Sequence, residues 1–282
     1  MAAGAMRFDM SLPLTGGLDS RLLLAATRDI ADTLSYHTLR YRDLTPESDD
    51  LRIPAKLLKQ LNLPHDIVDC TAPAPTWFQE TFADNALPSH VEEGATIAYG
   101  VARSHLRDKI AVIGCCPEVA RCFYYRFGTH EPITSIAPFL AIERGWGDIP
   151  FIRDHLTRWF NALQSSNHGV DLFDLFYWEH RVGGFMAHSQ LEQSIAYESF
   201  MPFNHRRMLS LLLSAPTKSR VAPHYRLYKA LLKRMWPETL AQPINPVSTR
   251  QALGDRLRYM LGRMGLYEAT RKLSAQIKHR RP

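Results

Sequence analysis

The stretch "SLPLTGGLDSRLLLAATRD", Ser11 to Asp29, decides the fold. A short apolar run ends just before Gly16 and Gly17, and the apolar residues after them recur at helical spacing. A Gly-Gly pair more often forms a simple turn between two strands. Here a helix follows it, so the sequence predicts a strand, a glycine loop and a helix. Such a junction places backbone N–H groups at the positive end of a helix dipole, where they can bind phosphate.

The polar residues of this loop favour phosphate chemistry. Thr15 and Ser20 supply hydroxyl donors, and the two glycines permit a tight turn and a close approach of a ligand to the backbone. A carboxylate such as Asp19 would repel a phosphate at this loop unless both bind the same Mg²⁺. The loop is not a Walker A motif, because it is too short and lacks the lysine.

Strand and helix patterns alternate through the first 130 residues. Alternation of this kind predicts an α/β fold, with a parallel sheet of about five strands and helices on both faces. Pro54 is expected in the first turn of its helix. The expected strands are residues 10–14, 33–41, 65–70 and 109–116, and the expected helices begin at about residues 22, 49 and 91.

The second half of the chain is mostly helical in pattern. Helices are expected over residues 149–164, 171–193 and 224–236, separated by proline-containing loops. We therefore expect an α/β region that carries the glycine loop over residues 1–140 and a helical region over residues 141–282.

Composition excludes some classes of protein. With 282 residues, 45% of them hydrophobic, the chain can bury a sizeable core. No apolar run approaches the roughly 18 residues of a membrane span, and the first residues lack the apolar core of a signal peptide. The four cysteines have no metal-ligand spacing. A reducing, cytoplasmic location is the expectation.

Positive charge is concentrated at the end of the chain. The net charge is +6, and residues 250–282 carry nine of the 34 basic residues but two of the 28 acidic ones. Since the rest is nearly neutral, the charge does not favour a nucleic-acid partner for the whole protein. The basic tail is interleaved with apolar residues. One hypothesis is therefore that it docks on an anionic membrane, on RNA or on a partner protein, and the other is a terminal helix packed on its own domain.

Four stretches resemble one known family. "LTGGLDSR" (Leu14 to Arg21) resembles the pyrophosphate loop, Ser-Gly-Gly-x-Asp-Ser, of the PP-loop ATP pyrophosphatases. Within that superfamily the chain is most similar to the synthetase domain of asparagine synthetase and β-lactam synthetase. Residues 49–69, 109–124 and 185–209 resemble its later segments in the right order, the last of them a helical segment.

The resemblance implies an activity. A substrate carboxylate would attack the α-phosphorus of ATP, with Mg²⁺ present, to give an acyl-adenylate and pyrophosphate. Ammonia or another amine would then displace AMP and form an amide.

The resemblance also assigns residues. It implies that residues 14–17, 19 and 20 and the glycine after the fourth strand bind the nucleotide. It also implies that Asp19, Arg21 and Glu118 are catalytic residues. Asp19 and Glu118 are the implied metal ligands, and Arg21, which replaces a usual serine, is placed to contact a phosphate oxygen. Arg121, three residues beyond Glu118, is interpreted as its ion-pair partner. The nucleotide-binding residues are Leu14, Thr15, Gly16, Gly17, Asp19, Ser20 and Gly114.

The chain departs from the family in two ways. The glutaminase domain and its cysteine nucleophile are missing, so the amine would come from solution, from a substrate or from a separate ammonia-supplying or biosynthetic partner protein; a missing upstream segment stays open. The family's late lysine has no counterpart, because Lys229 matches an earlier pattern. Two alternatives therefore remain: a PP-loop tRNA-modifying enzyme using Cys115 or Cys116, and an inactive partner protein that keeps the fold.

Overall fold

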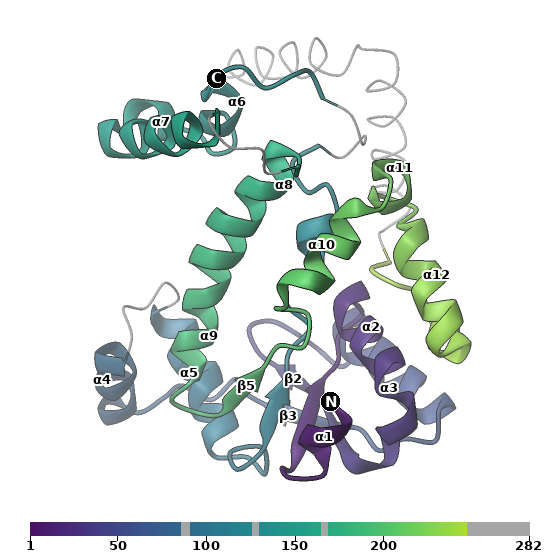
Figure 1. The fold of residues 1–282 in the computed structure, drawn as a ribbon. Coiled ribbons are helices and arrows are strands. Elements are labelled where there is room, and N and C mark those ends of the chain that lie inside the picture. The colour runs from purple at the N-terminus through teal and green to yellow at the C-terminus, as the bar shows by residue number, and fades with distance from the viewer. Residues whose placement is uncertain (86–90, 126–129, 165–168, 247–282) are drawn as a thin grey trace, which may run out of the picture.

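A five-stranded parallel sheet forms the centre of the computed structural model, which describes residues 1–85, 91–125, 130–164 and 169–246. Its strands lie in the order β3-β2-β1-β4-β5, with helices packed around them (Figure 1). The predicted fold class, an α/β fold with a mostly helical second half, is confirmed. The strands are β1 Met10–Pro13, β2 Leu34–Arg40, β3 Asp66–Asp69, β4 Ile110–Val112 and β5 Glu198–Phe200.

Apolar residues on one face of the sheet pack against α2 (Leu18–Ala26), α3 (Asp49–Gln60) and α12 (Arg226–Met235). Leu12 of β1 lies opposite Tyr36 of β2, and both side chains are buried on this face. The leucines after the glycine loop are buried beside them, as the spacing in the sequence predicts. This cluster fixes α2 directly behind the end of β1.

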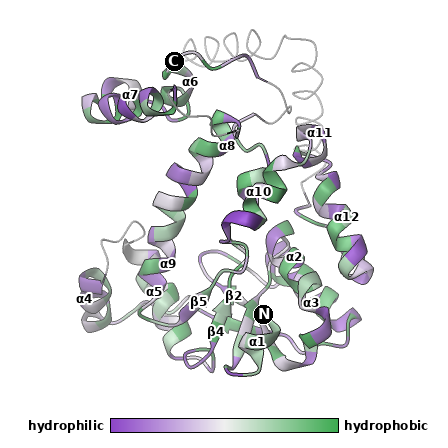
Figure 2. Ribbon diagram, viewed as in Figure 1, coloured by the Kyte–Doolittle hydropathy of each residue, from purple (hydrophilic) through white to green (hydrophobic). Residues whose placement is uncertain are grey.

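The other face is covered by α4 (Thr76–Asn85), α5 (Val91–Ala102) and α9 (Ala187–Gln193). Phe78, Phe82, Ala95 and Ala98 are buried here with Val68 of β3. Hydrophobic residues dominate the strands, whereas the outer helices carry both hydrophobic and hydrophilic residues (Figure 2). The prediction of helices on both faces is therefore correct.

The expected position of Pro54 is wrong. Pro54 lies inside α3, beyond its first turn, where proline costs a backbone hydrogen bond. Leu51, Ile53 and Leu57 are fully buried along the same helix. Their burial holds α3 in place despite the interruption.

The second half contributes helices and one strand. The helix expected over residues 171–193 is α8 (Leu172–Phe176), a π-helical segment η4 (Tyr177–Met186) and α9 in succession. The expectation of a helical segment over residues 185–209 is wrong at its centre, where β5 pairs with β4. The remaining elements are α1 Ala2–Ala5, η1 Arg28–Thr33, η2 Pro117–Ala120, α6 Ala137–Leu140, η3 Trp146–Asp148, α7 Pro150–Gln164, α10 Arg206–Ser214, α11 Thr217–Arg220 and η5 Pro237–Leu240.

The basic tail, residues 250–282, lies outside the described residues, so the two hypotheses for it remain predictions. Among the helices that are described, none has the length and apolar character needed to cross a bilayer.

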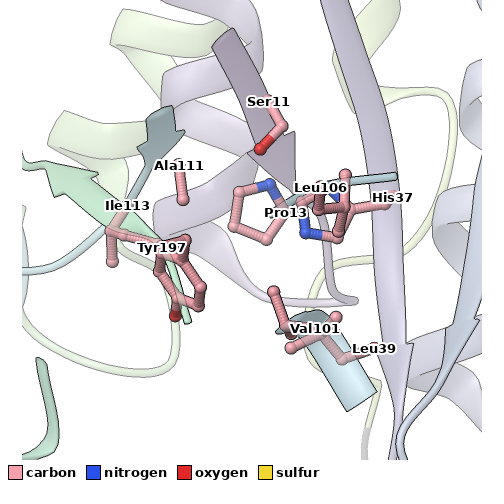
Figure 3. A pocket seen from close by; sticks show the side chains of 9 residues that line it. All are labelled: Ser11, Pro13, His37, Leu39, Val101, Leu106, Ala111, Ile113 and Tyr197. Atoms are coloured by element: carbon pink, nitrogen blue, oxygen red, sulfur yellow. The ribbon is translucent and has the colours of Figure 1, made fainter. Parts of the chain in front are cut away.

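A small cavity lies between the sheet and α5 (Figure 3). Its volume of about 20 Å³ is enough for one water molecule. His37 of β2 lines it together with Ser11, Pro13 and Tyr197. The imidazole is 4% exposed, and its Nδ1 has no hydrogen-bond partner among the described residues. Burial, with smaller contributions from His105 and His65, lowers the pKa of His37 to about 4.

His37→Leu is expected to reduce the amount of unfolding free energy that the protein loses when the pH is lowered. The folded-state pKa of His37 lies below the unfolded value of 6.5, so its contribution is present above pH 6.5 and is lost as the pH falls toward 4. Between pH 7 and pH 4.5 the wild type should lose about 2 to 3 kcal/mol more unfolding free energy than the variant. Urea unfolding measures this. The exposed His188→Leu control should follow the wild type; equal profiles for all three proteins would contradict the burial of His37.

Gly100→Ala is expected to destabilise the packing of α5 on β3. An added Cβ would lie 2.6 Å from Sγ and 2.8 Å from Cα of Cys70. Backbone would have to move, at a cost of about 1 to 3 kcal/mol in urea unfolding. Gly184→Ala is the matched control, because a Cβ there meets nothing within 4 Å. Equal stability of the two variants would mean that α5 does not approach Cys70 this closely.

Candidate nucleotide site

The glycine loop joins β1 to α2 at the centre of the sheet. Leu14 is buried at the end of β1, and Gly17 is the N-cap of α2 in an extended conformation (φ −77°, ψ 167°). A Cβ on Gly16 would lie 3.3 Å from Oδ1 of Asp50, and one on Gly17 would lie 3.0 Å from Oγ1 of Thr15. Close approach, not a left-handed backbone, therefore explains both glycines.

Three hydrogen bonds from backbone amides hold the loop in shape. Gly17 N–H donates to Oγ1 of Thr15 at 3.1 Å, and Thr15 N–H donates to Oγ of Ser20 at 3.3 Å. Gly16 N–H donates to Oδ1 of Asp50 at 3.0 Å, a contact with no signal in the sequence. In the described part of the chain no side chain caps α2. The amides of its first turn are therefore available to an anion.

The end of β4 packs directly against this helix. A Cβ on Gly114 would lie 3.1 Å from the carbonyl carbon of Asp19 and from the backbone nitrogen of Ser20. Only glycine permits this approach without a shift of backbone. The structure thus brings the loop residues and Gly114 together at the carboxyl ends of β1 and β4. Since the strand order changes direction there, this is where open α/β sheets bind ligands.

Asp19 is paired with Arg121 across the junction. An Nη2–Oδ2 contact of 2.8 Å joins them, and both side chains are more than three-quarters buried. The predicted partner of Arg121 was Glu118, so that interpretation is wrong; after the short turn η2, Arg121 reaches α2 instead. Tyr225 lies under the guanidinium, 5.9 Å from ring centre to Cζ. Burial raises the pKa of Asp19, and Arg121 opposes this shift.

Glu118 lies on η2, immediately after β4, and is 5% exposed. The turn begins at Cys116, whose φ of 87° is a strained conformation for a residue other than glycine. The Tyr228 hydroxyl secures it by donating to the carbonyl of Pro117 at 2.6 Å. Burial, with the nearby charge of Asp19, raises the pKa of Glu118 to about 7.

Arg21 does not face the loop. It is fully buried, and its guanidinium donates to the carbonyl oxygens of Gln242 and of Pro243, the latter at 2.9 Å. Burial lowers its pKa to about 10. The phosphate contact implied by the resemblance stays a prediction. The observed contacts make Arg21 an anchor for the segment after η5.

The two carboxylates fit a magnesium ion in part. Oδ1 of Asp19 and Oε2 of Glu118 are buried without a hydrogen-bond partner among the described residues. Hard oxygen ligands of this kind suit Mg²⁺, which is commonly bound by one or two carboxylates together with substrate phosphates. Within the described ranges no group of three His, Cys, Asp or Glu side chains could hold a metal unaided. Any Mg²⁺ here would therefore need phosphate oxygens as further ligands.

The cysteines beside the site are not activated. Cys115 is partly buried and Cys116 buried, and both are free thiols. Burial raises the pKa of Cys115 and raises that of Cys116 to about 12. Thiols in this state are poor nucleophiles at neutral pH.

The sequence matches no protein-family model, and no curated protein matches it either. The resemblance to the asparagine synthetase family therefore rests on the sequence motifs alone.

Proposed function

We propose that this chain is an ATP-dependent, AMP-forming amide ligase resembling asparagine synthetase. The observation that carries the proposal is the placement of an uncapped glycine loop, with Asp19 in the following helical turn, against the buried Glu118 at the point where the strand order reverses. The amides of the first turn of α2 and the helix dipole favour phosphate oxygens, while two carboxylates with unpartnered oxygens favour the accompanying cation.

The proposed reaction has two steps. A substrate carboxylate oxygen bonds to the α-phosphorus of ATP as the bond to the β-phosphate bridging oxygen breaks, and pyrophosphate leaves. An amine nitrogen then bonds to the acyl carbon, AMP leaves with the bonding pair, and the amine loses a proton to solvent. The small-molecule carboxylate and amine are the substrates.

The chain's own residues act by position and charge. The α2 amides and the Thr15 and Ser20 hydroxyls orient the departing pyrophosphate. Arg121 holds Asp19 in place and opposes the rise that burial causes in the pKa of its carboxyl. Bound Mg²⁺, held by Asp19 and Glu118, would neutralise phosphate charge as it develops.

The alternatives are less well supported. The high thiol pKa values of Cys115 and Cys116 disfavour a sulfur-transferring tRNA enzyme. An inactive partner protein stays open, because the family's late lysine has no counterpart and Lys229, which matches an earlier pattern, is exposed on α12. Four free thiols agree with the proposed cytoplasmic location.

Asp19→Asn should weaken MgATP binding at least about tenfold, because a charge-assisted contact to the cation is lost. Isothermal titration with MgATP measures the affinity, and pyrophosphate exchange with a panel of carboxylic acids measures the first step. The exposed Asp29→Asn on η1 is the control and should behave as wild type. A wild-type protein that binds no MgATP would refute the proposal, and full activity of Asp19→Asn would refute this assignment of the loop.

Glutamine should not serve as the amine source for this chain alone. Its four cysteines are free, and burial raises the thiol pKa of each, so none supplies the thiolate of a glutaminase. Glutamate release from glutamine is the measurement, with ammonium as the comparison amine. Release at enzymatic rates by the pure protein would overturn this prediction.

A further inference from the structure

The segment after η5, residues 241–246, lies against the glycine loop. Asn245 N–H donates to the carbonyl of Gly16 at 2.9 Å, and a Cβ on Gly17 would lie 3.6 Å from Oδ1 of Asn245. The Asn245 side chain is exposed and therefore lies beside the loop without being buried by it. Rotation of its amide about the last torsion exchanges oxygen for NH₂, so it can present a donor to an anion at the loop.

Arg21 holds this segment in place. Its two guanidinium contacts fix the carbonyls of residues 242 and 243, three and two residues before Asn245. Gln242 adds a contact from its Nε2 to Oε1 of Gln60 at 2.9 Å, and Ile244 packs against the core. A buried arginine whose hydrogen bonds here go to backbone carbonyls is suited to fixing a chain segment, because its planar fork binds two acceptors at once.

We propose that Arg21 is a positioning residue that holds residues 242–245 against the loop, so that the Asn245 amide completes the phosphate site. This inference rests on the proposed nucleotide binding and adds a contact from the far end of the chain to it. The site then has three parts: the loop with α2, the turn after β4, and this segment.

The first test is Asn245→Asp, with inorganic pyrophosphate and MgATP as probes in isothermal titration. A carboxylate at this position repels phosphate while keeping the size and the left-handed backbone (φ 44°) that asparagine and aspartate both tolerate. Affinity for both probes should fall about tenfold or more, with the unfolding temperature nearly unchanged. Asn62→Asp is the matched control, since Asn62 is also exposed and left-handed (φ 57°) but lies at the far end of α3; its affinities should equal those of wild type.

The second test is a double-mutant cycle with Arg21→Lys and Asn245→Ala. Each change alone should weaken pyrophosphate binding severalfold. Once lysine has released the segment, removing the Asn245 amide should cost nothing more, so the double variant should bind like Arg21→Lys alone. Arg153→Lys is the control for loss of a guanidinium that donates to a backbone carbonyl away from the site, and it should leave affinity unchanged.

The outcomes separate the two proposals. A wild-type protein that binds neither probe would overturn the proposed function and this inference with it. A wild type that binds, beside an Asn245→Asp variant that binds equally well, would overturn this inference alone. Additive effects in the cycle would overturn the positioning role of Arg21, and an Arg21→Lys protein that fails to fold leaves the Asn245→Asp test decisive.

Discussion

The contact between Gly114 and the first turn of α2 is the constraint on which the site depends. Because a glycine follows β4 at position 114, the chain approaches the backbone of Asp19 and Ser20 more closely than a Cβ ordinarily allows. That approach places η2 over the helix N-terminus and brings Glu118 and Arg121 to Asp19. A larger residue at position 114 would push the chain after β4 and the first turn of α2 apart by a few tenths of an ångström, even if every polar side chain were kept.

The charges at this junction are expensive to bury and are only partly compensated. Arg121 forms an ion pair with Asp19. Glu118 has one oxygen without a hydrogen-bond partner among the described residues, and the pKa of its carboxyl is raised. A structural ion pair would be expected to satisfy its buried oxygens, since an unmet charge costs several kcal/mol. A site that accepts a cation and phosphate gives a physical reason for leaving them unsatisfied.

Much of the α/β half could be predicted, because its signals are local. Four strands, the glycine loop and the helix after it follow from apolar runs and from two glycines. β5 was missed because it has three residues, is mostly exposed and lies in a segment with a helical pattern. The position of Pro54 depends on burial that outweighs a local preference, and the partner of Arg121 depends on a tertiary contact across 102 residues. Asp50 and Asn245 carry no local signal, because they reach the loop only once the sheet has formed.

The first turn of α2 explains how one short motif organises distant parts of the chain. Asp19 and Arg21 are two residues apart, so their side chains leave the helix on nearly opposite sides. One binds Arg121 after β4, and the other binds the carbonyls before Asn245. The planar guanidinium of Arg21 binds both carbonyls at once, which a short hydroxyl side chain could not do. Arg21 therefore links the last described segment to the first turn of α2.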